Sequence, residues 1–365
     1  MSGSHIYVTQ NADALKGRGT SLNPANRFEA AQYDDFDDGW DHHDLAEKPR
    51  TTLLKDATRS IITRNDSPDI KFERSINPYR GCEHGCIYCF ARPSHAYLGL
   101  SAGLDFETKI VFKPEAPHLL EKELSRSAYK PDVIVLGSNT DPYQPVERTL
   151  GLTRAILEVL ERFNHPVSIV TKSANILKDR DLLARMSAKR LARVHISITT
   201  LNPELARLME PRAASPSNRL STISALAEAG IPVGVLASPM IPGLNDPELE
   251  AILNKAALAG ATSAGTILLR LPHELGPLFT AWLEQFVPER AAHILSLTRQ
   301  SRDGKMNNST FHERFKGSGQ YADILTQRFQ KTVKRLGLNT NIAALDCSQF
   351  YVPGRVPANL QMNLF

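Results

Sequence analysis

The chain has 365 residues, of which 42% are hydrophobic and 22% charged, and its formal net charge is +4 at pH 7. This length allows one large domain with appendages or two ordinary domains, and the hydrophobic fraction supports a sizeable core. No apolar run approaches the roughly 18 residues of a membrane span, and the first 20 residues lack the apolar region of a signal peptide. We therefore expect a cytoplasmic protein with no membrane partner.

The first 58 residues are polar and acid-rich around positions 34–44, and we expect them to form an irregular N-terminal extension. From residue 59 onward, short β-branched runs alternate with amphipathic helical stretches, which is typical of a βα repeat. The expected strands are 76–79, 133–136, 167–171, 194–199, 232–237 and 266–269. The expected helices between them are 149–163, 217–229 and 251–259, and the last two end at Gly230 and Gly260.

Six βα units predict an α/β fold in which a parallel sheet closes only part-way into a barrel, here over residues 59–271. The reactive groups of such folds lie at the C-terminal ends of the strands. After residue 271 the pattern becomes helical, with helices expected at 274–286, 289–298 and 321–336. We therefore expect a C-terminal helical extension over 272–338 and an irregular tail over 339–365.

Three of the four cysteines lie within eight residues, in the string Gly81-Cys82-Glu83-His84-Gly85-Cys86-Ile87-Tyr88-Cys89-Phe90. Thiolates with this C-x3-C-x2-C spacing can bind three irons of one [4Fe–4S] cubane, because glycines beside them allow a tight loop. The fourth iron stays open to a substrate or cofactor. The motif follows an expected strand, where a cluster loop of a barrel belongs.

Two other interpretations of the cysteines remain at this point. Zinc could bind the triplet with His84 or the distant Cys347 as fourth ligand, although structural zinc usually takes separated pairs of ligands. The three thiols could also belong to a core, which is improbable at this density. Cysteines that are so few and so clustered are typical of a metal site in a reducing compartment rather than of a disulfide framework.

The cysteine motif and the βα array together resemble the radical S-adenosylmethionine (SAM) enzymes over roughly residues 58–350. Within that superfamily the chain resembles the DNA-repair photolyase-like group that includes spore photoproduct lyase, and most closely an uncharacterised bacterial subfamily. The matching strings are SINPYRGCEHGCIYCFARPSHAYLGL, GSNTDPYQPVER, IVTKS, SITTLN, EPRAASP and IPGLND. The resemblance implies a partial (β/α)6 TIM barrel of the radical SAM type and a [4Fe–4S] cluster that cleaves SAM to a 5′-deoxyadenosyl radical. It also implies reduction by a donor such as flavodoxin or ferredoxin.

The resemblance also implies SAM-binding residues at the ends of successive strands. Thr140 and Asp141 match the positions that hold the amino-acid end of SAM, Lys172 matches a lysine that ends the third strand, and Ser197 matches a serine that ends the fourth. An ammonium group attracts a carboxylate, and hydroxyls can bind ribose or carboxylate. We expect Tyr88 and Phe90, the two aromatic residues beside Cys89, to line the adenine of SAM.

This chain departs from spore photoproduct lyase at the hydrogen-atom donors. That enzyme returns a hydrogen atom through a cysteine and a pair of tyrosines. The cysteine position is Ser138 here, the second tyrosine position is Phe90, and only Tyr88 keeps its hydroxyl. We therefore do not expect repair of the thymine dimer. Cys347 could donate only if the tail folded into the barrel mouth, and a buried structural thiol is the better expectation.

Three functions compete on the sequence alone. The first is a radical SAM enzyme that acts on nucleic acid, most readily DNA, because the resemblance, the basic balance and arginine-rich pieces such as 189–193 favour phosphate contacts. The second is a radical SAM enzyme for a small molecule or peptide. The third is a non-catalytic iron–sulfur or zinc protein.

The last five residues, Gln361-Met362-Asn363-Leu364-Phe365, resemble the Q-L-S/D-L-F pentapeptide that docks bacterial DNA-processing proteins on the replicative sliding clamp. Gln361, Leu364 and Phe365 match that pattern. Two apolar side chains in such a segment could fill a preformed pocket while the glutamine amide fixes the register. The sequence thus predicts a sliding clamp as a partner.

Overall fold

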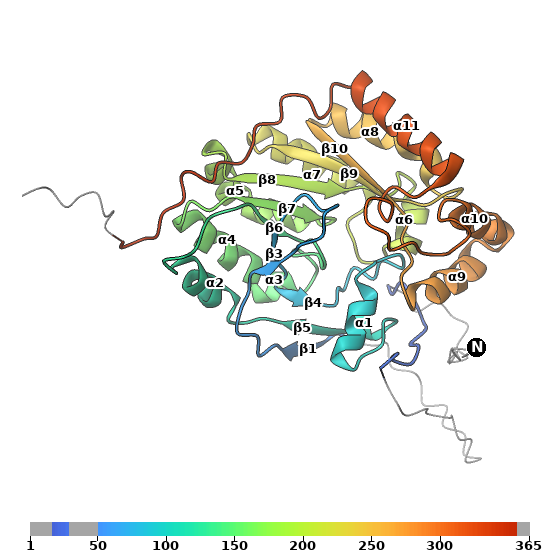
Figure 1. Ribbon diagram of the computed structural model, residues 1–365, viewed down its shortest axis with the longest axis horizontal. Coiled ribbons are helices and arrows are strands. Elements are labelled where there is room, and N and C mark those ends of the chain that lie inside the picture. Colours follow the sequence, from blue (N-terminus) through green and yellow to red (C-terminus); the bar gives the residue numbers. More distant parts are fainter. Residues whose placement is uncertain (1–16, 29–49, 356–365) are drawn as a thin grey trace, which may run out of the picture.

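The computed structural model describes residues 17–28 and 50–355, which form the two sheets and surrounding helices shown in Figure 1. The strands are β1 (Thr52–Lys55), β2 (Thr63–Arg64), β3 (Arg74–Ile76), β4 (Tyr79–Arg80), β5 (Lys109–Phe112), β6 (Ile134–Leu136), β7 (Val167–Thr171), β8 (Ala192–Ser197), β9 (Val233–Met240) and β10 (Ser263–Leu268). The expected clamp-binding pentapeptide and most of the expected N-terminal extension lie outside the described residues.

The larger sheet has the strand order β10-β9-β8-β7-β6-β3-β2. Every pairing from β3 to β10 is parallel, and only the edge strand β2 runs antiparallel to its neighbour. The β-branched runs expected as six parallel strands correspond to β3, β6, β7, β8, β9 and β10, with ends shifted by a few residues. Because parallel strands share one C-terminal edge, the loops that follow them meet there.

The helices connect and cover these strands. They are α1 (Asp105–Thr108), α2 (Ala116–Leu124), α3 (Glu147–Leu150), α4 (Leu152–Arg162), α5 (Arg180–Ala188), α6 (Pro203–Met209), α7 (Pro216–Glu228), α8 (Leu249–Leu258), α9 (Leu275–Phe286), α10 (Pro288–Gln300) and α11 (Gly319–Arg335). Three short 3-10 helices are η1 (Arg92–Leu98), η2 (Ala174–Asp179) and η3 (Asp246–Glu248). The helix expected at 149–163 is divided into α3 and α4 at Gly151, whose φ of 62° is left-handed.

The main core lies between the larger sheet and the helices α2, α4, α5, α7 and α8, which Figure 1 shows around the strands. Strand β7 alternates buried and half-buried residues, and α4 turns its apolar side toward the sheet. A smaller core gathers the cysteine loop, α9 and α10. The cysteine loop is therefore packed into the structure on more than one side.

A second sheet was not expected from the sequence. It has three strands in the order β1-β5-β4, with β1 parallel and β4 antiparallel to β5. The segment expected as an irregular N-terminal extension over 1–58 contains one short strand, Thr52–Lys55, because β5 offers it a strand to pair with. The sheet places β4 directly before the cysteine loop.

The part of the chain after residue 271 is helical, as expected. Helix α11 packs against α8 and β10, and α9 packs against α10. The loop between α10 and α11 reaches both edges of the larger sheet, because Leu268 N donates to Phe315 O and Arg314 pairs with Asp69, which lies between β2 and β3. Residues 339–355 contain neither helix nor strand. None of the described helices is long and apolar enough to cross a lipid bilayer.

Candidate active site

The cysteine loop begins directly after β4 and folds tightly. Gly81 and Gly85 have φ values of 81° and 67°, which side chains rarely adopt. A Cβ added at Gly81 would lie 2.9 Å from Phe106 O, and one at Gly85 would lie 2.7 Å from Glu107 Oε2. The loop therefore needs glycine at both positions for its backbone conformation and for its close approach to the segment at residues 106–107.

A fully buried arginine, Arg92, binds the backbone of this loop. Arg92 donates from Nε to Cys86 O at 2.9 Å and from Nη2 to Gly85 O at 3.0 Å. Its other guanidinium nitrogen bonds Gly103 O, and its charge is met by the equally buried Glu107. A buried ion pair of this kind persists only when hydrogen bonds satisfy both partners, as they do here. The pair fixes the backbone on both sides of the second cysteine of the motif.

The three thiols of the motif lie close together. Cys82 and Cys86 are buried, Cys89 is partly exposed, and none of them forms a disulfide. Burial raises the pKa of all three thiols, and each feels the charge of at least one neighbour in the triplet or of Lys172. A bound iron supplies the positive charge that turns such thiols into thiolates.

Three free thiols on one short loop are chemically suited to three irons of one cubane. Within residues 17–28 and 50–355, no three His, Cys, Asp or Glu side chains converge as one bound ion requires. Thiolates on a [4Fe–4S] cluster each bind a different iron, so they need no such convergence. His84, one of the alternative zinc ligands, instead lies with Nδ1 3.4 Å from Asp141 Oδ2.

Cys347, the other alternative ligand, lies at the opposite end of the strands. The segment around it runs beside residues that precede strands, because Asp346 N donates to Arg190 O and Tyr351 N donates to Phe163 O. The Cys347 thiol is partly exposed and feels the charge of Asp132, which precedes β6. Cys347 is neither at the barrel mouth nor fully buried. It therefore cannot bind the same metal site as Cys82, Cys86 and Cys89.

Asp141, which follows β6, connects the end of β6 to the end of β7 by hydrogen bonds. Its Oδ1 accepts the Thr171 hydroxyl at 2.7 Å, and its Oδ2 accepts Lys172 N at 2.7 Å. Burial alone raises the pKa of Asp141, but His84 and these hydrogen bonds bring it down to about 2. The carboxylate is thus ionised and occupied by groups of the protein. Its neighbour Thr140 is buried and donates to Tyr79 O at 2.8 Å.

Lys172, at the end of β7, points toward the cysteine loop. Its Nζ lies 5.8 Å from the centre of the Tyr88 ring, and its charge lowers the pKa of the Cys86 and Cys89 thiols against the larger effect of burial. Among the described residues, no carboxylate lies within ion-pair distance of this ammonium. Within residues 17–28 and 50–355, Lys172 is thus a cation without a carboxylate partner, and it lies beside the loop that carries the three thiols.

The end of β8 is tied to Tyr88 by a buried network. Ser197 donates to Ser238 O at 3.1 Å, and its own carbonyl accepts Arg219 Nη1 at 3.0 Å. Arg219 pairs with Glu210, which also accepts the Tyr88 hydroxyl. The network therefore fixes the Tyr88 ring relative to the strand that carries Ser197.

The remaining site positions expected from the sequence lie in different surroundings. Phe90 is 48% exposed, so it lies at the rim of the loop while Tyr88 is buried. Ser138, which follows β6, accepts Asn77 Nδ2 at 3.3 Å and is half-buried. The ends of β6, β7 and β8 and the cysteine loop thus bring the expected residues to one edge of the sheet.

Sequence reasoning missed the buried residues that support this edge. Gln144 is fully buried, accepts Glu83 N at 2.8 Å and donates to Gly81 O at 3.2 Å. Together with Arg92 and Glu210 it holds the loop that carries the cysteines. The only sequence signal was polar residues close to the motifs, and it could not distinguish these residues from solvated ones.

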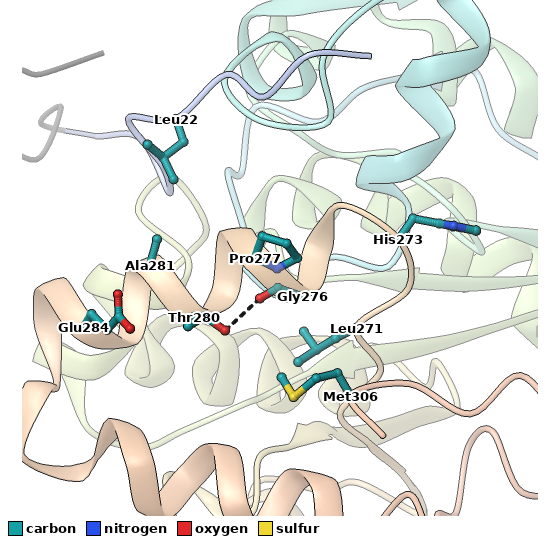
Figure 2. A pocket seen from close by; sticks show the side chains of 9 residues that line it. All are labelled: Leu22, Leu271, His273, Gly276, Pro277, Thr280, Ala281, Glu284 and Met306. Atoms are coloured by element: carbon teal, nitrogen blue, oxygen red, sulfur yellow. Dashed lines mark hydrogen bonds between the residues drawn. The ribbon is translucent and has the colours of Figure 1, made fainter. Parts of the chain in front are cut away.

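A separate pocket of about 580 Å³ lies beside α9 (Figure 2). Leu22, Leu271, Pro277 and Met306 give it a largely apolar lining, and His273 lies at one end. No residue of the cysteine loop lines this pocket. Leu271, which lines the pocket, follows the end of β10 by three residues, and it belongs to the same hydrophobic cluster as Cys86 and Tyr88.

Comparison with known proteins agrees with this geometry. Residues 76–256 match the Radical SAM superfamily. An uncharacterized protein of Mycobacterium tuberculosis is 35% identical over 233 residues, which cover 63% of this chain and 68% of that protein. An uncharacterized protein of Methanocaldococcus jannaschii is 29% identical over 196 residues, covering 54% and 70% of the two chains.

Solved structures give the same fold. Spore photoproduct lyase complexed with dinucleoside spore photoproduct superposes with a TM-score of 0.55 at 17% identity, covering 78% of this chain and 80% of that one. A point mutant of the same lyase gives a TM-score of 0.55 at 18% identity over the same shares. The partial barrel expected from the six βα units is confirmed.

Proposed function

Because this chain belongs to the radical SAM superfamily and is an enzyme of it, we propose that it acts on nucleic acid, and on DNA rather than RNA. The superfamily uses a [4Fe–4S] cluster and SAM, so the alternative of a non-catalytic metal module is set aside. When bound, these cofactors supply a 5′-deoxyadenosyl radical that abstracts a hydrogen atom from the substrate. The reaction also requires an electron donor, for which flavodoxin or ferredoxin is suitable.

The cluster ligands in this proposal are Cys82, Cys86 and Cys89. Three observations support them: the thiols are free, they lie close together, and the loop that carries them is held by buried groups. Arg92 and Gln144 hold the loop backbone through hydrogen bonds to Gly81 O, Glu83 N, Gly85 O and Cys86 O. These bonds are made by the protein alone.

SAM binding falls to the strand ends beside this loop. The ammonium of Lys172, which has no carboxylate partner among the described residues, suits the SAM carboxylate, and the Ser197 hydroxyl lies at the end of the next strand. Thr140 and Asp141 support the SAM site indirectly. Their side chains bond other groups of the protein and so hold β6, β7 and the cysteine loop together. Tyr88 and Phe90 present aromatic faces on either side of Cys89 for the adenine.

Tyr88 holds the one hydroxyl left among the donor positions of spore photoproduct lyase. The Tyr88 hydroxyl donates to the buried Glu210 carboxylate, and Thr199 Oγ1 lies 3.1 Å from the Tyr88 oxygen. Ser138 cannot replace a thiol as a donor, because an O–H bond gives up its hydrogen atom far less readily. We therefore propose a reaction other than thymine-dimer repair.

The observation that carries the nucleic-acid proposal is an exposed aromatic pair next to the cysteine loop. Phe28 and Tyr97 are 59% and 73% exposed, and their ring centres are 5.2 Å apart. The Arg27 guanidinium lies 4.6 Å from the Phe28 ring and 5.2 Å from the Tyr97 ring. Exposed aromatic rings beside an arginine are the surface on which single-stranded bases stack. Tyr97 belongs to η1, which begins at Arg92, so this surface adjoins the proposed cluster.

The test is nucleic-acid-dependent SAM cleavage. Reduced, reconstituted enzyme is incubated with SAM and with single-stranded DNA, ultraviolet-irradiated duplex DNA or RNA, and 5′-deoxyadenosine and the mass of the nucleic acid are measured. We expect DNA to raise 5′-deoxyadenosine formation and to change in mass. Tyr97→Ala should weaken DNA binding by about 1–3 kcal/mol, whereas Tyr351→Ala, at a residue 51% exposed elsewhere, should not. Binding without salt dependence, and no stimulation by any nucleic acid, would favour a small molecule or peptide as substrate.

We also propose the sliding clamp as a partner, on the sequence of residues 361–365 alone. Binding of the clamp by the full chain is compared with binding by a chain truncated after Asn359. We expect micromolar affinity, roughly −8 kcal/mol, that is lost on truncation and in the double variant Leu364→Ala/Phe365→Ala. Equal binding by both chains, or none by either, would contradict the docking.

A further inference from the structure

Two arginines meet just beyond the C-terminal end of β10. Arg270 follows the strand by two residues, and Arg302 comes from the end of α10. Arg302 is 1% exposed, and its Nε and Nη2 bond Leu269 O at 3.0 and 2.6 Å. The two guanidinium groups are close enough for the charge of Arg270 to act on Arg302. Strand β10 is therefore capped by cations at the same edge that carries the other strand ends.

In the part of the chain that the structure describes, both arginines keep a buried nitrogen atom without a hydrogen-bond partner. These atoms are Arg270 Nε and Arg302 Nη1. An unsatisfied buried donor costs about 1–3 kcal/mol, and more when it is charged, so such groups usually have a ligand or water. The two guanidinium groups, whose charges act on each other, thus keep donor capacity that an added acceptor could use.

The charge around these arginines is not balanced. Arg314 acts on Arg270 as a third cation, and Asp69 is the carboxylate recorded near them. Asp69 is already bound by Arg314 Nε at 2.7 Å. Burial, and then Arg270, lower the pKa of Arg302 to about 10, the expected sign for a buried cation beside a like charge. An anion placed between Arg270 and Arg302 would remove this repulsion.

Strand β10, at the edge of the sheet, is less buried than the other parallel strands. Residues Ser263–Ile267 are half-buried, whereas β3, β6, β7, β8 and β9 bury at least half of their residues. The Phe315 ring lies 5.0 Å from the Arg270 guanidinium.

We propose that Arg270 and Arg302 form a binding site for a phosphate group of the substrate. Guanidinium forks match phosphate oxygens with paired hydrogen bonds, which is why arginine is favoured where phosphate is recognised. The ligand is a phosphodiester of the nucleic-acid backbone, held at the strand edge that also carries the cysteine loop. The identification of the ligand as a phosphodiester rests on the proposed nucleic-acid substrate. The inference that the site binds a phosphate group does not depend on that proposal.

The test uses three probes and the full chain. The probes are inorganic phosphate, the dinucleotide thymidylyl-(3′→5′)-thymidine, and its uncharged methylphosphonate analogue. Binding is followed by phosphorus NMR and calorimetry, without cofactors or turnover. Arg270→Gln should weaken the dinucleotide at least 10-fold, which is about 1.4 kcal/mol, and should leave the uncharged analogue unaffected. Arg270→Lys keeps the charge but loses the paired hydrogen bonds of the guanidinium. Its affinity for the dinucleotide should therefore lie between those of the parent and Arg270→Gln.

The controls separate the possible failures. Arg126→Gln removes an exposed arginine after α2 and should change nothing. Because Arg302 also holds backbone carbonyls, Arg302→Gln is used only if its unfolding transition matches the parent. Arg270-dependent binding of inorganic phosphate but not of the dinucleotide would uphold the anion site and contradict the nucleic-acid substrate. Dinucleotide binding that is equal in the parent and Arg270→Gln, or no binding of either phosphate probe, would overturn the site.

Discussion

Replacement of Arg92 by methionine tests whether the cysteine loop is held by a buried ion pair. The guanidinium of Arg92 bonds the carbonyls of Gly85, Cys86 and Gly103 and pairs with Glu107, and both charged side chains are fully buried. Methionine preserves much of the volume but removes the charge and all of these donors. The change therefore leaves the buried Glu107 carboxylate without its arginine and removes hydrogen bonds from four carbonyls, those of Gly85, Cys86, Ala102 and Gly103.

The expected cost is large because the partner charge stays behind. Removing one member of a buried ion pair typically costs about 3–5 kcal/mol. Glu107 keeps its bond from Gly19 N at 2.9 Å, which moderates the loss. We expect Arg92→Met to lower the free energy of unfolding by about 3–5 kcal/mol at pH 8 and to accelerate cluster loss. Arg92→Met combined with Glu107→Gln should cost less than Arg92→Met alone, because the unpaired charge is gone.

The sign of the pH dependence follows from Glu107. Burial raises the pKa of Glu107 above its unfolded value, and Arg92 opposes that rise. Without Arg92 the folded-state pKa rises further, so the folded variant binds a proton that the unfolded chain has released. That contribution to stability is present below the unfolded pKa and is lost as pH rises through the folded pKa. The variant should thus lose less stability at pH 5.5 than at pH 8.

The assay is urea unfolding of reconstituted parent and variants at both pH values, with iron content measured alongside. A loss below about 1 kcal/mol, within the range of an exposed pair, would refute the reasoning. So would a loss that grows as pH falls.

Three further predictions follow from the same edge of the sheet. Lys172→Ala should weaken SAM binding by roughly 1.5–3 kcal/mol, the scale of a hydrogen bond to a charged group, while iron content stays at the parent level. Equal SAM affinity would contradict the assignment. Gly85→Ala forces a methyl to within 2.7 Å of a carboxylate oxygen at a φ of 67° and should cost at least about 1 kcal/mol in chemical unfolding. Spore photoproduct should not be restored cleanly to two thymines, because Ser138 and Phe90 lack the donor groups. Quantitative repair seen by chromatography would overturn that expectation.

The parallel sheet was predictable because its signals are local. Each buried parallel strand is a short apolar run between helices, and Val167–Thr171 matches its expected range. The small sheet gave no such signal. Strand β4 has two residues, and β1 pairs with a strand more than 50 positions later, so its pairing depends on tertiary contacts.

The site was predictable only where chemistry and spacing coincide. Cysteines at a fixed spacing identify themselves, and a lysine or serine that ends a strand can be assigned by resemblance. Arg92 and Glu210 could not be found, because charged residues are seldom fully buried. Their ion-pair partners, Glu107 and Arg219, lie 15 and 9 positions further on, which is not the spacing of a helical pair. The hydrogen bonds of Asp141 could not be predicted either, because only the fold shows that its carboxylate bonds Thr171 and Lys172.

The central claim is that the cysteine loop holds the cluster that cleaves SAM. The most direct measurement is 5′-deoxyadenosine, quantified by mass spectrometry from anaerobically reconstituted and reduced protein given SAM, with iron counted in the same samples. The parent should hold about four irons and form the product. Cys86→Ala should lose both signals, and Cys347→Ala, at the far end of the strands, should keep both. Product formation by Cys86→Ala at the parent rate, or a parent that remains colourless and binds zinc alone, would contradict the account.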